Sequence, residues 1–175
     1  MGRNRRGLAA SAVTLAATVL IAGCGSGGGS GGQANGLELG AGGVEFSASQ
    51  LGGGELASAD LAGRDTVLWF WAPWCTTCRA ESDDVVAAAA ALDGQVEVVG
   101  VASRGGVAEM EGFVADTGTD GLTHVADESG SIWSDFGVVT QPAYAFVDDD
   151  GSVEVVVGAL GEAALTDRMT ALAET

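Results

Sequence analysis

The sequence predicts an α/β domain whose central mixed sheet is covered by helices on both faces. Strand and helix patterns alternate between residues 66 and 136, which is the order that builds parallel strands. The chain then closes with a β-hairpin pattern and one helix, so antiparallel strands should join the same sheet. A third observation indicates where a reactive site would lie in this fold: Cys75 and Cys78 come soon after the most apolar strand pattern.

The first half of the domain leads to this cysteine pair. The run 66–72 reads Thr-Val-Leu-Trp-Phe-Trp-Ala and is apolar on both faces, as in a central strand covered on two sides. A helix should follow over 76–92 and end at Gly94, because glycine commonly stops helices. Ahead of the apolar run we expect a weak strand at 44–46, a hairpin tip at 51–56 and a short helical turn at 58–61.

The second half continues the alternation. Ile132, Trp133 and Phe136 recur at the spacing of one buried helix face, and the acidic run 148–151 separates two apolar strands as a hairpin turn does. The expected elements are, in order, a strand at 96–101, a helix at 107–116 with Met110, Phe113 and Val114 on one side, a strand at 122–126, a helix at 129–136, strands at 143–147 and 153–157, and a closing helix at 162–172.

The amino-terminal residues predict export and a lipid anchor. Residues 1–23 combine three arginines, an apolar run and small residues, which is typical of a signal peptide. Ile-Ala-Gly-Cys, ending at Cys24, resembles the lipobox of bacterial lipoproteins, which implies cleavage before Cys24 and lipid on its thiol. Residues 24–36 are then a lipidated cysteine with a Gly/Ser-rich tether, and 37–175 the folded domain. A plain secretory signal before an unpaired cysteine is the alternative.

Charge excludes several kinds of partner. Cleavage before Cys24 would leave four arginines and no lysine against 24 acidic residues, a formal charge near −20. Nucleic acids and anionic lipid surfaces both require cationic patches, so neither should bind this domain. Attachment to the membrane should therefore come from the lipid anchor alone.

The cysteine pair predicts thiol–disulfide chemistry. Two cysteines three positions apart at the first turn of a helix can close and reopen a disulfide, and the partial positive charge of the helix end favours a thiolate at Cys75. A structural disulfide and half of a zinc site are the alternatives. A zinc site would need a second Cys pair or His partners, whereas the chain has three cysteines and one histidine.

Three segments carry a family resemblance: 71–81 (Trp-Ala-Pro-Trp-Cys-Thr-Thr-Cys-Arg-Ala-Glu), 127–130 (Asp-Glu-Ser-Gly) and 141–148 (Gln-Pro-Ala-Tyr-Ala-Phe-Val-Asp). Over about residues 42–174 the chain resembles the TlpA/ResA/DsbE-like branch of the thioredoxin family, whose members are extracytoplasmic and often membrane-tethered. The resemblance implies a thioredoxin-like fold and an enzyme that exchanges disulfides with secreted or envelope proteins. It also implies a membrane redox partner, a place on the outer face of the cytoplasmic membrane, and a redox-active Cys75–Cys78 disulfide with no bound cofactor or metal.

The same resemblance assigns roles around the disulfide. Cys75 would lie at the exposed end of the motif, with its sulfur facing solvent, and would form the mixed disulfide with the substrate. Cys78, one helical turn deeper, would resolve it. Pro142 would be a cis-proline facing the disulfide, with Gln141 before it. Apart from the resemblance, the position of Trp74 beside Cys75 predicts that its side chain is exposed and shapes the substrate groove.

Glu81 is the expected proton carrier of the site. Thioredoxin has a buried acid six residues before its first cysteine, but here that position is Trp69. Many members of the TlpA-like branch instead carry an acid three residues after the second cysteine, where this chain has Glu81. The resemblance therefore implies that Glu81 relays the proton of Cys78. The alternative is a surface acid without a chemical role.

The direction of the reaction stays open at this point. Gln141-Pro142-Ala143 resembles secreted actinobacterial members regarded as oxidants, which favours oxidation. The alternatives are a reductase in cytochrome c maturation, a copper-handling lipoprotein using Cys75, Cys78 and His124, and a redox-inert binding lipoprotein. His124 is more simply interpreted as a hydrogen-bonded strand residue.

Overall fold

The computed structural model describes residues 36–40 and 43–175. The predicted signal peptide 1–23, the lipidation site Cys24 and all but the end of the tether lie outside these residues. Within the described part of the chain, no helix combines the length and the apolar character needed to cross a bilayer.

A six-stranded mixed sheet forms the centre of the domain, with strand order β1-β8-β7-β4-β5-β6. The strands β4, β5 and β6 are parallel, whereas β7 runs antiparallel to β4 and β8 antiparallel to both β7 and β1. This arrangement confirms the predicted mixed sheet. The strands span Leu37–Glu38 (β1), Thr66–Trp71 (β4), Glu97–Ser103 (β5), Thr123–Asp127 (β6), Ala143–Val147 (β7) and Ser152–Val157 (β8).

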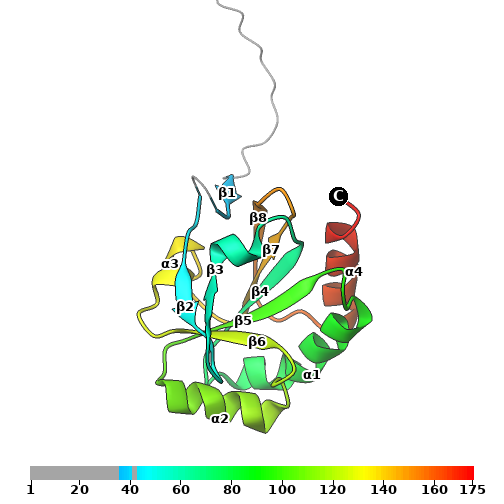
Figure 1. The fold of residues 1–175 in the computed structure, drawn as a ribbon. Helices are drawn as coiled ribbons and strands as arrows, with labels where there is room; N and C mark the ends of the chain where they lie inside the picture. The colour runs from blue at the N-terminus through cyan, green and yellow to red at the C-terminus, as the bar shows by residue number, and fades with distance from the viewer. Residues whose placement is uncertain (1–35, 41–42) are drawn as a thin grey trace, which may run out of the picture. The chain divides into compact units, whose positions relative to one another are not determined.

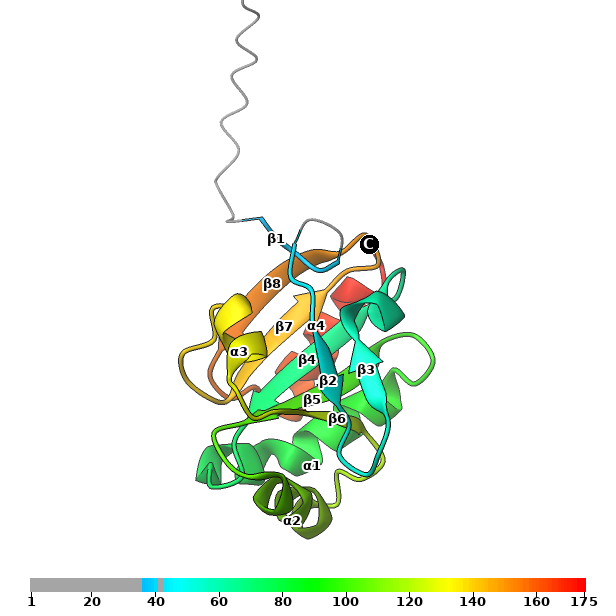
Figure 2. The ribbon, with the colours of Figure 1, turned by 60° about the vertical axis from the view of Figure 1, so that its left-hand side comes forward.

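Helices cover both faces of the sheet, as the sequence predicted (Figures 1 and 2). One face packs against α1, α2 and α4, and the other against α3, the 3-10 turn η1 and the two-stranded sheet of β2 and β3. Strand β4 contributes side chains to the core on both faces of the sheet. Trp69 and Trp71 pack on the face covered by α1, α2 and α4, and Leu68 and Phe70 pack on the opposite face. The remaining elements are β2 (Ser47–Ser49), β3 (Glu55–Ala57), η1 (Ser58–Leu61), α1 (Thr76–Ala91), α2 (Val107–Thr117), α3 (Ser131–Asp135) and α4 (Glu162–Leu172).

The strand expected at 44–46 is wrong in its position. Val44 is buried and makes only an isolated bridge to Leu39, and the strand itself begins at Ser47. The strand starts later than expected because its partner is residues 55–57. The predicted hairpin turn brings 47–49, and not 44–46, opposite these residues in antiparallel register. Strand β1 was not predicted, since two residues carry no pattern that a sequence can show.

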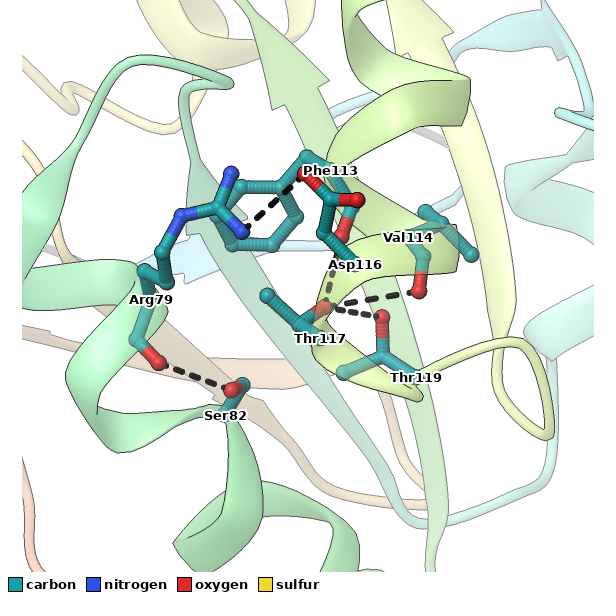
Figure 3. Close-up of polar contacts among 7 residues, drawn as sticks. All are labelled: Arg79, Ser82, Phe113, Val114, Asp116, Thr117 and Thr119. Atoms are coloured by element: carbon teal, nitrogen blue, oxygen red, sulfur yellow. Dashed lines mark hydrogen bonds and ion pairs between the residues drawn. The ribbon is translucent and has the colours of Figure 1, made fainter.

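Helix α2 contacts α1 through the side chain of Arg79 (Figure 3). The Arg79 guanidinium lies 5.0 Å from the centre of the Phe113 ring and 3.5 Å from the Asp116 carboxylate. The Thr117 hydroxyl donates a 2.8 Å hydrogen bond to the Phe113 carbonyl and closes the last turn of α2. Because Arg79 directly follows Cys78, these contacts position α2 against the first turn of α1.

Candidate active site

Cys75 caps the amino-terminal end of α1. Its backbone is extended (φ −73°, ψ 109°), and its Sγ accepts a 3.0 Å hydrogen bond from the Cys78 N–H. A tight turn at the end of β4 sets this geometry, with the Cys75 N–H donating to the Ala72 carbonyl at 3.0 Å. When the disulfide opens, the same N–H and the helix end favour negative charge on Cys75, so this sulfur is built to act as a thiolate.

Cys75 and Cys78 form a disulfide, with 5.3 Å between their Cα atoms. Cys75 is 6% exposed and Cys78 is fully buried, so Cys75 is the more accessible sulfur, as expected. The expectation that the Cys75 sulfur faces solvent freely is wrong for this oxidised state, because the bond ties it to its buried partner. A substrate thiolate can therefore reach the disulfide only from the side of Cys75.

The cis-proline was predicted and is present, in the Gln141–Pro142 peptide bond. Strand β7 begins directly after it and pairs antiparallel with β4, so that Ala143 lies opposite Phe70. One further residue along this register brings Pro142 to the end of β4, where the cysteine turn begins. The sheet thus places the proline loop beside the disulfide.

Trp74 lies on the surface next to Cys75, with 60% of its area exposed, as the sequence predicted. Its indole Nε1 donates a 2.9 Å hydrogen bond to the backbone carbonyl of Arg104, in the loop between β5 and α2. The same loop packs closely against the turn that leads to Cys75, because a side chain at Gly105 would collide with the ring of Pro73. The sequence analysis missed Arg104, for which the only signal is its place just after a strand of the parallel part of the sheet.

Glu81 is buried, which excludes the surface-acid alternative. Only 4% of the residue is exposed, and its Oε1 accepts a 2.8 Å hydrogen bond from the Trp69 indole. It follows Cys78 by three positions, so both lie on the same side of α1. Burial raises the pKa of Glu81 from 4.5 to about 7, against the opposing effect of the Trp69 hydrogen bond. A carboxyl that titrates near neutral pH can both give and take a proton.

Tyr144, which the sequence analysis did not assign a role, is the third member of this buried group. Its hydroxyl and the Leu160 backbone lie beside the Glu81 carboxylate and favour its charged form. Burial raises the pKa of Tyr144, and the charge of Glu81 raises it further, so the phenol remains a donor. Neither the Tyr144 hydroxyl nor Glu81 Oε2 has a hydrogen-bond partner of good geometry, although both are buried.

His124 is a hydrogen-bonded strand residue, as its simpler interpretation predicted. It is buried, its Nδ1 accepts from the Trp71 indole at 3.3 Å, and its Nε2 donates to the Thr119 carbonyl at 3.0 Å. Gly100 leaves room for this pair, because a side chain there would collide with His124 and with Trp71. Among the described residues, no group of three His, Cys, Asp or Glu side chains is arranged to hold a metal ion.

The chain matches the model of the AhpC/TSA family over residues 40–156. The soluble secreted antigen MPT53 of Mycobacterium tuberculosis is 36% identical over 132 residues, which are 74% of this chain and 75% of that protein. The structure of MTB dsbF in its mixed oxidized and reduced forms has a TM-score of 0.70 and 46% identity, over 73% of this chain and 94% of that one. A secreted M. tuberculosis disulfide oxidoreductase homologous to E. coli DsbE has a TM-score of 0.68 and 37% identity, over 73% and 96%.

Proposed function

We propose that this chain, which belongs to the AhpC/TSA family and is a thiol–disulfide oxidoreductase of the DsbE-like thioredoxin type, oxidises the thiols of secreted or envelope proteins. The observation that carries the proposal is the Cys75–Cys78 disulfide at the end of α1, beside the cis-proline and one turn before a buried acid. The electrons are exchanged between sulfurs, so the reaction needs no bound cofactor.

The reaction proceeds through one mixed disulfide. A client thiolate attacks the Cys75 sulfur, the Cys75–Cys78 bond breaks, and Cys78 leaves with the electron pair. A second client thiolate then attacks the client sulfur bound to Cys75 and releases Cys75 as a thiolate. The client gains one disulfide, and the protein gains two electrons and holds two thiols. An oxidising redox partner, which we place in the membrane, must then restore the Cys75–Cys78 disulfide.

Glu81 supplies the proton that the buried Cys78 needs when it leaves. An unpaired thiolate in the core is costly, because burial penalises the charged form. With a pKa of about 7, a large share of Glu81 is protonated at neutral pH and can neutralise Cys78. In the reverse step the carboxylate takes the same proton back, so the acid serves oxidation and reduction alike.

The reduction potential of the cysteine pair tests the oxidative role. We expect equilibration with glutathione buffers to give a value between roughly −180 and −120 mV, the range of protein disulfide isomerase and DsbA. The protein should also form disulfides in reduced, unfolded ribonuclease A. A potential near −270 mV, about that of thioredoxin, would instead favour the reductive role in cytochrome c maturation. The copper-handling alternative has less support, because both nitrogens of His124 are already engaged.

We place the protein in the cell envelope, attached to the outer face of the cytoplasmic membrane through Cys24. Support comes from the lipobox-like residues before Cys24 and from the secreted relatives. We expect mass spectrometry of the native protein to find acylated Cys24 as its first residue, and Cys24→Ser to move the protein from the membrane fraction to the medium. An unmodified Cys24 thiol, or retention of residues 1–23, would contradict the anchor.

A further inference from the structure

Three loops meet at the disulfide, and one arginine joins them. The Arg104 Nη1 donates to the side-chain oxygen of Gln141 at 3.2 Å, and its Nη2 donates to the Val139 carbonyl at 2.8 Å. Its own carbonyl accepts the Trp74 indole N–H at 2.9 Å. The cysteine turn, the loop after β5 and the cis-proline loop are therefore connected through Arg104.

The guanidinium is held in place rather than left mobile on the surface. It stacks over the Trp133 ring at 4.8 Å from the centre, and Trp133 is itself fixed by its indole N–H donating to the Val101 carbonyl at 3.0 Å. Arg104 also has a left-handed backbone conformation (φ 61°), in which an arginine is rarely found. Unusual backbone geometry of this kind concentrates at functional sites.

Arg104 differs from the other arginines of the domain. Across residues 36–40 and 43–175, Arg64, Arg79 and Arg168 each pair with a carboxylate, whereas Arg104 forms no ion pair. Its hydrogen bonds go instead to neutral oxygens that belong to the rim of the active site. In a chain with so many acidic residues, this placement is not explained by surface charge balance.

Two of the joined loops carry exposed apolar side chains. Val139 is 77% exposed and Trp74 60%, and both belong to segments that Arg104 contacts. A hollow of about 440 Å³ lies alongside, lined among others by Arg104, Trp133 and Val139. Trp74 directly precedes Cys75, so a client that reaches this sulfur comes close to the rim.

From these contacts we infer that Arg104 is a positioning residue for client proteins, which holds Trp74, Val139 and Gln141 in one fixed rim for the cysteine-bearing segment of the client. The inference rests on the proposed function and adds a residue to it. A small dithiol does not need this rim, because it contacts little beyond the disulfide. Removing the guanidinium should therefore discriminate between the two kinds of substrate.

The experiment compares a protein client with a small one, using the full chain. For Arg104→Ala we expect kcat/KM towards reduced, unfolded ribonuclease A to fall roughly tenfold, chiefly through KM, while the rate with dithiothreitol changes less than about twofold. Arg104→Lys should remain at least about threefold below the parent, because a single ammonium lacks the planar fork. The matched control is Arg168→Ala, which removes an arginine far along the chain on α4 and should leave both rates near those of the parent.

Other outcomes separate this inference from the proposed function. An equal loss with both substrates, no loss with either, or full recovery by Arg104→Lys would overturn the positioning role alone. A parent that reduces insulin instead of oxidising ribonuclease A would overturn only the oxidative direction, and the same comparison would then be made with insulin. A parent inactive in both directions would overturn the proposed function and this inference together.

Discussion

Replacing Cys78 with serine should turn the protein into a trap for its clients. The remaining Cys75 thiolate can still run the exchange in reverse by attacking a client disulfide, and without Cys78 the protein has no second thiol to resolve the mixed disulfide that forms. Cys75→Ser should trap few clients or none, because Cys78 is fully buried and lies a turn deeper in α1. Both variants should lose catalytic turnover, by about 100-fold or more, since each removes a partner of the two-step exchange.

Non-reducing gels of cell envelopes measure the trapping, and alkylation by iodoacetamide measures the reactivity of each remaining thiol. For the alkylation both variants are made in a Cys24→Ser background, so that the third cysteine contributes no adducts, whereas the trapping gels use chains that keep Cys24 and its membrane attachment. Cys75 should be alkylated faster because it accepts the Cys78 N–H at the helix end. Faster labelling of Cys78, or trapping by Cys75→Ser alone, would reverse the assigned roles.

The fold could be predicted because its elements carry strong local signals. The run 66–72 is apolar on both faces, and the structure places it as β4 at the centre of the sheet. The closing helix at 162–172 was predicted with the bounds that the structure has. The amino-terminal strands were harder, because β1 and β2 have only two and three residues, and β1 pairs with β8, which lies more than a hundred residues later in the chain.

Residues of the site could be predicted only where their type and their position in a motif indicate a chemical role. The two cysteines, Pro142 and Glu81 occupy positions that motifs define. Trp69 was interpreted as a core residue, which it is, and nothing in the sequence shows that its indole N–H is directed at Glu81. Arg104 was missed for the same reason, because its partner Gln141 lies 37 residues away in sequence and meets it only in the folded chain.

Glu81→Gln should slow one chemical step and leave the other intact. When the reduced protein reacts with 5,5′-dithiobis(2-nitrobenzoate), attack by Cys75 releases a first nitrothiobenzoate and attack by Cys78 on the adduct releases a second. The amide keeps an oxygen for the Trp69 indole but cannot accept the Cys78 proton. We expect the second phase to slow by about 100-fold, a typical loss for a general base, and the first to be unchanged. Equal slowing of both phases, or of neither, would contradict the relay.

The same substitution should stabilise the folded protein at alkaline pH. Burial raises the pKa of Glu81 from 4.5 to about 7, so between these values the folded state holds a proton that the unfolded state has lost. Stability of the parent therefore falls as pH rises through this window and is level above it. A neutral glutamine has no such dependence. The free energy of unfolding of the variant should therefore exceed that of the parent by an amount that grows from near zero below pH 4.5 to about 1–3 kcal/mol above pH 7.

Chemical denaturation of the oxidised parent and of the Glu81→Gln variant across pH 4 to 9 measures this difference. Burial lowers the pKa of His124, so protonation of its ring destabilises both proteins equally in acid and cancels in the comparison. A variant with the same pH dependence as the parent would show that Glu81 is ionised without cost. If the variant is more stable and its second nitrothiobenzoate phase is slow, the fold keeps a destabilising buried acid at Glu81 because the reaction of Cys78 requires it.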